Sequence, residues 1–235
     1  MSKSHGPSAP ANFPLRGWFA DSHPGFRREI LGLARPKAFA AGTIIYKAGD
    51  AGREIFGIRS GVVTLQGRFT HPDAMLLHML RAGDWFGTVP VLAGRSRRIN
   101  AAARTDVELL RVPGEELQAL LRRHPEWVVD LGRDVVYSLD VALQGAADLL
   151  IRNASPRCAA VLLRLAGRRW ASGPDAGMPS GIPASQSEIA MLCNVSRNTF
   201  SRVMREFTSL GLVTLGYRSL TVNDPAGLRA VADGG

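Results

Sequence analysis

The segment "ASQSEIAMLCNVSRNTFSRVMREFTSLGLV", residues 184–213, constrains the fold more than any other part of the chain. Its pattern predicts two short helices joined by a tight turn. Ser185 followed three residues later by Glu188 is typical of a capping box at the start of the first helix. Asn194 lies in the turn "CNV", where we expect a left-handed backbone. Ser196 is the expected N-cap of the second helix.

The second helix, 196–209, has two chemically different faces when it is drawn at about 100° per residue. One face is apolar and is expected to be buried: Phe200, Val203, Met204, Phe207 and Leu210. The other face is polar and lies near the helix N-terminus: Arg197, Asn198, Ser201 and Arg202. Arginine can pair with guanine, and asparagine with adenine, through two hydrogen bonds in the major groove. We therefore predict that these four residues contact DNA bases.

A second set of polar side chains suits phosphate contacts, which position a protein on DNA without reading its sequence. The set is Ser185, Gln186, Ser187, Ser196, Thr199 and Arg218, the last on an expected two-stranded wing over 211–222. The alternative is an ordinary amphipathic helix pair with a solvated basic face. Agreement between the caps, the turn and the two faces favours DNA binding.

The composition limits the remaining functional classes. A net charge of +9 suits a polyanionic partner, although charge alone does not separate nucleic acid from a membrane surface. No apolar run reaches the roughly 18 residues that cross a bilayer. The first twenty residues lack a secretory signal, so we expect a cytoplasmic protein with a disordered leader over 1–20 and no membrane partner.

Neither the cysteines nor the histidines show the spacing of a metal site. Cys158 and Cys193 are expected to be buried small side chains, and no disulfide is expected. No pairing of a nucleophile with a base is evident, so an enzyme is disfavoured. A remaining alternative is a ligand-binding module that acts on a protein partner and carries a degenerate DNA domain. Arg197 and Arg202 argue against it.

The rest of the chain predicts an α+β protein with three parts. Residues 21–124 combine short strands and glycine-containing turns with flanking helices, which indicates an antiparallel roll or barrel. The first flanking helix, within 21–35, is expected to be capped by Asp21 or Ser22. Residues 125–152 predict one long helix, and residues 153–235 a small helical domain.

The long helix has a narrow apolar seam, so it could pack on its own sheet domain or pair with a second copy. We expect both, with one face on the domain and the seam in a parallel homodimer. The seam recurs at spacings of three and four residues: Val128, Leu131, Val135, Leu139, Ala142, Ala146 and Leu149.

Three features follow one another along the chain: "GTIIYKAGDAGREIFGIRSGVVTL", the loop "FGTVPVLAGRSRRINA" and the helix-turn-helix. With these features in this order, the chain resembles the Crp/Fnr family of bacterial transcription regulators over about 36–225. The resemblance implies a cyclic-nucleotide-binding-type β-roll, a dimerising helix and a winged helix-turn-helix that binds a pseudo-palindromic operator. It also implies RNA polymerase as a partner of the loop 171–183, for which a plain solvated loop is the alternative. In the family's cyclic-AMP receptor a glutamate stands where this chain has Asn198, so we expect a different base pair there.

The same resemblance assigns an effector pocket to Gly87, Thr88, Arg97, Arg98, Ile99, Ala142 and Leu143. Gly87 and Arg98 match the phosphate-binding loop of the cyclic-AMP receptor. Thr88 and Ile99 replace a glutamate and a serine that hold the nucleotide, and Ala142 and Leu143 replace the pair that reads adenine. Each hydrogen bond lost from a buried site costs about 1–3 kcal/mol. We therefore expect no cofactor, and an effector other than cyclic AMP or none.

Overall fold

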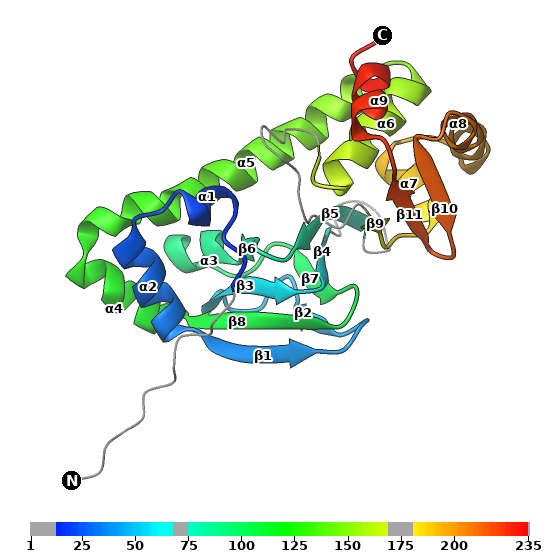
Figure 1. The fold of residues 1–235 in the computed structure, drawn as a ribbon. Helices are drawn as coiled ribbons and strands as arrows, with labels where there is room; N and C mark the ends of the chain where they lie inside the picture. Colours follow the sequence, from blue (N-terminus) through cyan, green and yellow to red (C-terminus); the bar gives the residue numbers. More distant parts are fainter. Residues whose placement is uncertain (1–12, 68–74, 169–180, 235) are drawn as a thin grey trace. The chain divides into compact units, whose positions relative to one another are not determined.

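The computed structural model describes residues 13–67, 75–168 and 181–234. The chain divides into two compact units, residues 1–139 and 140–235. The division falls inside the long helix α5 (Val128–Leu150), whereas the sequence suggested a boundary at 152/153. The predicted α+β class and antiparallel roll are confirmed (Figure 1).

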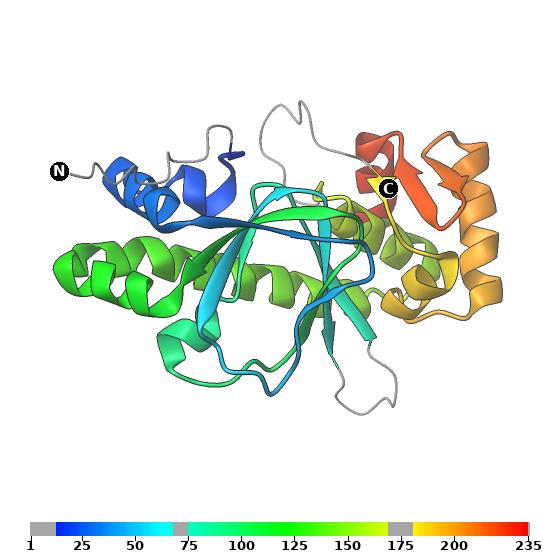
Figure 2. The same ribbon diagram turned by 90° about the horizontal axis from the view of Figure 1, so that it is seen from below.

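The first unit contains two antiparallel sheets of four strands each, in the orders β1-β8-β3-β6 and β2-β7-β4-β5. Figure 2 shows the roll that these strands form. Their bounds are β1 (Arg35–Phe39), β2 (Ile44–Tyr46), β3 (Glu54–Ser60), β4 (Val62–Gly67), β5 (Met75–Arg81), β6 (Trp85–Phe86), β7 (Asn100–Ala103) and β8 (Val107–Pro113). Strand β1 was not predicted. It is an exposed edge strand, where a proline such as Pro36 is tolerated.

Apolar and aromatic side chains fill the interior of this roll. The rings of Phe56 and Phe86 stack with their centroids 5.2 Å apart, and the ring of Tyr46 lies 5.9 Å from that of Phe86. Burial raises the pKa of Tyr46 to about 12, against the opposing charge of Arg97. The roll therefore has a packed aromatic centre of its own.

The flanking helices of the first unit are α1 (Gly17–Ala20), α2 (Pro24–Leu33), α3 (Thr88–Ala93) and α4 (Gly114–Arg123), with a short 3₁₀ turn η1 (Pro125–Trp127). The N-cap of α2 is His23, whose imidazole accepts from Gly25 N–H at 3.1 Å. The prediction of Asp21 or Ser22 as this cap is wrong. Imidazole nitrogen performs the same task as a carboxylate or hydroxyl oxygen.

The prediction of a disordered leader over 1–20 is wrong for residues 13–20. Phe13, Trp18 and Phe19 are buried in the core, and the ring of Phe19 lies 4.9 Å from that of Trp85. The residues around these three aromatic side chains are mostly polar or small, so the sequence did not indicate that the rings are buried. Residues 1–12 lie outside the described residues.

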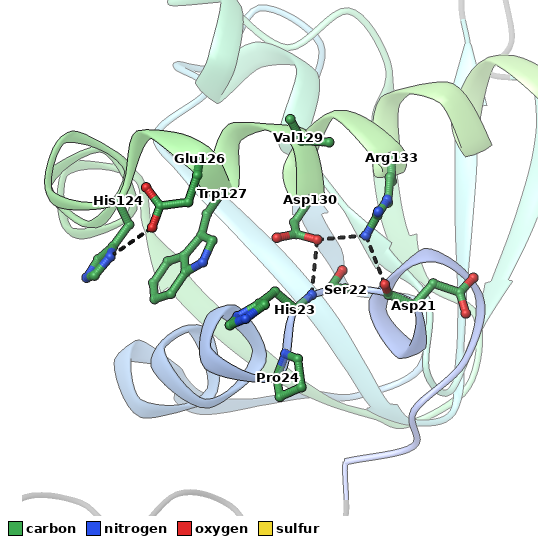
Figure 3. A pocket seen from close by; sticks show the side chains of 10 residues that line it. All are labelled: Asp21, Ser22, His23, Pro24, His124, Glu126, Trp127, Val129, Asp130 and Arg133. Carbon is green, nitrogen blue, oxygen red and sulfur yellow. Dashed lines mark hydrogen bonds and ion pairs between the residues drawn. The ribbon is translucent and has the colours of Figure 1, made fainter.

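The start of α5 is fixed against the segment before α2 (Figure 3). Asp130 Oδ1 accepts from the His23 backbone N–H at 3.1 Å and from Arg133 Nη1 at 2.8 Å. The ring of Trp127, just before α5, stacks on that of His124 with centroids 4.0 Å apart. These side chains line an open hollow that no sequence pattern indicated.

The inner face of α5 carries a buried carboxyl group, Asp134. Burial raises its pKa to about 7; the nearby Thr88 and Trp18 side chains oppose the shift, and the charge of Asp84 adds to it. Since this pKa lies above the unfolded value of about 3.9, the folded state binds the proton more tightly. Its contribution to stability is therefore complete below about pH 4 and is lost as pH rises through about 7.

We expect the Asp134→Asn variant to lose part of this pH dependence, because the amide is neutral at every pH. Its free energy of unfolding, measured with urea at about pH 5 and pH 8, should fall less with pH than that of the wild type. Asp140→Asn, at an exposed position of the same helix, is the matched control. Equal slopes for the wild type and Asp134→Asn would contradict this assignment.

The second unit is built around α6 (Ala154–Leu165), which packs on α8 and α9. Its other elements are β9 (Gly181–Ile182), α7 (Gln186–Leu192), α8 (Arg197–Ser209), β10 (Val213–Gly216), β11 (Ser219–Val222) and α9 (Pro225–Ala232). The strands form one antiparallel sheet in the order β10-β11-β9. Cys158 and Cys193 are buried and free, as predicted.

Candidate nucleic-acid interface

The first helix of the candidate interface, α7, begins with the predicted capping box. Glu188 N–H donates to Ser185 Oγ at 3.2 Å, and Ser185 N–H donates to Glu188 Oε2 at 2.8 Å. The Ser185 hydroxyl also donates to that carboxylate, at 2.7 Å. Its proton is thus already used within the cap, which leaves Gln186 and Ser187 as the better phosphate donors on α7.

The turn between the two helices has the predicted left-handed residue. Asn194 has φ of +49°, a conformation that asparagine tolerates better than most residues. Ser196 then caps α8, with its Oγ accepting from Thr199 N–H at 3.1 Å. The hydroxyls of Ser196 and Thr199 lie 2.9 Å apart, so one of the two protons stays free for a phosphate oxygen.

Helix α8 has the two faces that the sequence predicted. Phe200, Val203, Met204 and Phe207 are buried. Leu210, placed on the same face by the sequence, is 61% exposed, so that prediction is wrong. The helix ends at Ser209, so Leu210 lies beyond its last turn, and Gly211 with φ of +72° changes the direction of the chain before Leu212 and Val213, which are buried.

The four predicted base-contacting residues lie on the accessible side of α8. Arg197, Asn198 and Arg202 are exposed, and Ser201 is partly exposed. The first turn of α8 contains no acidic residue, so its positive end and its arginines act together on an anion. This arrangement suits entry of the helix N-terminus into the major groove.

The predicted wing is the hairpin β10–β11, with register from Val213↔Val222 to Gly216↔Ser219. Arg218 is exposed in its turn and has φ of +48°. The helix α9 that follows was not predicted. Asp224, which accepts from Ala226 and Gly227 N–H, and Pro225 in the first turn are start signals that could have found it.

The phosphate-cassette-like loop of the roll is closed by its own arginine, which is Arg97. Arg97 Nη1 donates to the Gly87 carbonyl at 2.9 Å, and Nη2 to the Glu54 carbonyl at 2.5 Å. Its guanidinium lies over the ring of Tyr46, 4.2 Å from the centroid. Gly87 has φ of +89°, a conformation that residues with a side chain rarely adopt, and a Cβ there would lie 3.0 Å from the Glu54 carbonyl oxygen, so glycine is favoured at this position.

The other residues of the predicted effector pocket differ in their exposure. Arg98, matched to the phosphate-binding arginine by its separation from Gly87, is exposed, and its role in an effector pocket stays a prediction. Thr88 is buried near Asp134, and Ile99 is half-buried. Ala142 and Leu143 are exposed on α5, within the second unit.

The roles of Arg97 and Arg98 can be separated by stability measurements. We expect Arg97→Gln to lower the free energy of unfolding by about 1–3 kcal/mol, because two part-buried carbonyls lose a charged donor. Arg98→Gln, at the adjacent exposed position, should change it by less than about 0.5 kcal/mol. Urea unfolding of both variants checks this, and equal effects would contradict the closure of the loop by Arg97.

Comparison with known proteins agrees with this geometry. Residues 36–124 match the cyclic nucleotide-binding domain family, and residues 156–231 match the Crp-like helix-turn-helix domain family. The chain belongs to the Crp/Fnr family of transcription regulators. As in its relatives, the function is DNA-binding regulation of transcription through the helix-turn-helix.

Two relatives of this Crp/Fnr regulator illustrate the similarity. The cyclic AMP receptor protein of Thermus thermophilus is 29% identical over 198 residues, which cover 84% of this chain and 88% of that protein. A CRP-like cAMP-activated global transcriptional regulator of Mycobacterium tuberculosis is 24% identical over 208 residues, which cover 88% of this chain and 92% of that protein. The second is named as a transcriptional regulator, and neither name is that of an enzyme.

Solved structures share the fold of the regulator. A CRP/FNR-family transcriptional regulator from Thermus thermophilus superposes with a TM-score of 0.63 at 26% identity, covering 85% of this chain and 98% of that one. FixK2 from Bradyrhizobium japonicum superposes with a TM-score of 0.69 at 19% identity, covering 84% of this chain and 96% of that one. None of the helices in the described ranges is long and apolar enough to cross a membrane. Residues 171–180 of the loop assigned to RNA polymerase lie outside those ranges.

Proposed function

We propose that the regulator acts as a homodimer on a two-fold symmetric operator, with the N-terminal turns of α8 from each protomer in the major groove. The observation that carries this proposal is the exposed polar end of α8, where Arg197, Asn198 and Arg202 stand over a buried apolar face. Ser187, Thr199 and Arg218 would contact phosphates beside it. No catalytic role is assigned to any residue.

An exposed apolar seam on α5 supports the homodimer. Val129, Val136, Leu143 and Leu150 recur every seven residues and are 65%, 59%, 59% and 82% exposed. Gly132, Leu139 and Ala146 fall between them, which completes the a and d positions of a heptad repeat. A second copy of α5 would bury this face and stabilise a parallel pair.

This seam differs from the one that the sequence predicted. Leu131 is fully buried in the core of its own unit, so its assignment to the dimer seam is wrong. Val135 is half-buried, whereas Val128, Leu139, Ala142, Ala146 and Leu149 stay exposed. The exposed face is centred one residue further along the helix, because the first turns of α5 pack inward.

We also propose that cyclic AMP is not the effector, although two relatives are named for it. The support is the self-contained contact of Arg97 with Gly87, Glu54 and Tyr46, together with Thr88 and Ile99 at positions where the receptor has polar ligands. A different effector, or none, is consistent with these side chains.

The effector proposal predicts that cyclic AMP leaves the DNA affinity unchanged. The test is fluorescence anisotropy with a labelled operator, with and without about 1 mM cyclic AMP, followed by thermal unfolding under the same conditions. A ligand at 100 times its Kd stabilises the folded state by about 2.7 kcal/mol, which a thermal shift detects. An increase in the DNA affinity or in the unfolding temperature on adding cyclic AMP would contradict the proposal. A small-molecule extract tested in the same way separates another effector from none.

A further inference from the structure

One guanidinium in the second unit joins the end of α5 to the turn of the helix-turn-helix. Arg157, in the first turn of α6, donates from Nη1 to the carbonyls of Ile151 at 2.6 Å and Arg152 at 3.1 Å. From Nε it donates to the carbonyl of Cys193 at 2.7 Å, and from Nη2 to that of Asn194 at 3.4 Å. All the carbonyls that accept from it therefore come from two segments that are far apart in the sequence.

These carbonyls lie where two helices end. Ile151 and Arg152 follow the last residue of α5, and Cys193 is the C-cap of α7. The last carbonyls of a helix have no partner within it, and the helix dipole places negative charge there. A cation between two such helix ends donates hydrogen bonds to the free carbonyls of both helices and balances the negative charge there. Arginine suits the position because its planar fork directs donors from three separate nitrogens, whereas the three donors of lysine lie on one atom.

A second arginine of α6 strengthens the same attachment. Arg164 Nε lies 2.9 Å from Asp148 Oδ2, with side chains only 7% and 2% exposed. Arg164 follows Arg157 by seven residues, which places both on one side of α6. The C-terminal part of α5 is thus attached to α6 at two points, and Arg157 also donates hydrogen bonds to the turn before α8.

We propose that Arg157 is a positioning residue for operator binding. By holding the turn at Cys193 and Asn194 against the end of α5, it fixes α8 relative to the helix that carries Leu143 and Leu150. In a dimer paired through those leucines, this sets the distance and rotation between the two recognition helices. The inference rests on the proposed homodimer, and it adds the residue that sets the half-site spacing.

The test measures how strictly the protein requires one spacing. Four duplexes are needed: the selected operator, the same operator with its spacer lengthened or shortened by one base pair, and a single half-site. One base pair moves a half-site by about 3.4 Å and turns it by about 34°. Fluorescence anisotropy gives the affinity of each variant for each duplex. Circular dichroism and thermal unfolding establish that each variant is folded.

We expect the wild type to lose about tenfold or more in affinity when the spacing changes, and Arg157→Gln to lose less than about threefold. The affinity of Arg157→Gln for the single half-site should stay within about twofold of the wild type. Arg152→Gln is the matched control, since it removes one exposed charge nearby and keeps the carbonyl that Arg157 binds. Arg157→Lys keeps the charge without the fork and should give intermediate discrimination. It also serves as the test variant if Arg157→Gln does not fold.

Several outcomes would overturn the inference. The first is wild-type discrimination in every folded Arg157 variant. The second is an equal relaxation in Arg152→Gln, since charge alone would then explain it. The third is a loss of half-site affinity with the spacing requirement intact, which would make Arg157 a local support of the turn. A wild type without any spacing preference would contradict the proposed homodimer itself, and so is distinguishable from failure of the role of Arg157.

Discussion

Replacing Arg197 by alanine is expected to weaken operator binding by about 1–3 kcal/mol, or about 5- to 150-fold. Arg197 is the first residue of α8, is exposed, and lies at the helix end that we propose enters the major groove. Loss of a two-hydrogen-bond contact with guanine should also remove the preference for that base. The measurement is the affinity of the variant for the operator and for every single-base substitution in one half-site.

The matched control is Arg205→Ala, which removes an exposed arginine two turns further along α8. At that depth the helix is leaving the bases, so affinity should fall equally for all sequences. An Arg197→Ala variant that weakens binding equally for every sequence would show a phosphate contact. The assignment of Arg197 to a base would then be wrong.

Placing carboxylates in the α5 seam is expected to separate the protomers. Val136 and Leu143 are exposed in the single chain and occupy equivalent heptad positions. In the Val136→Glu/Leu143→Glu variant, like charges would face each other across the pair, at a cost of several kcal/mol. We expect the dimer dissociation constant to rise by about a thousandfold or more. Affinity for the full operator should fall with it.

Analytical ultracentrifugation over a range of concentrations checks the seam prediction. Ser138→Glu is the control, since it adds a carboxylate at another exposed position of α5, outside the a and d positions. It should leave the dimer intact. Equal sedimentation of the seam variant and the wild type would contradict pairing through this face.

The sequence predicted the helix-turn-helix well because its signals are local. A capping box, a left-handed asparagine and a serine cap each depend on a few neighbouring residues, and all were found at Ser185, Asn194 and Ser196. The apolar face of α8 followed from helical periodicity. The prediction of a buried side chain was wrong only for Leu210, which follows the last residue of the helix, where that periodicity no longer applies.

The errors lie where a single residue of register decides which way a side chain points. The sequence did not show that Arg97 is buried and Arg98 exposed, because side chains just before a strand alternate between inside and outside. The α5 seam was misplaced at Leu131 because periodicity does not say which face the protein's own core covers. The early aromatic residues Trp18 and Phe19 were missed because their partners, such as Trp85, are distant in sequence.

Selection of binding sites from random DNA tests the central claim most directly. A homodimer that presents two copies of α8 predicts an inverted repeat, with half-site centres about 10 base pairs apart or a multiple of that distance. It also predicts a strongly specified base pair in each half-site that is lost on replacing Arg197. Selected sites without two-fold symmetry would contradict the homodimeric function proposed for this regulator.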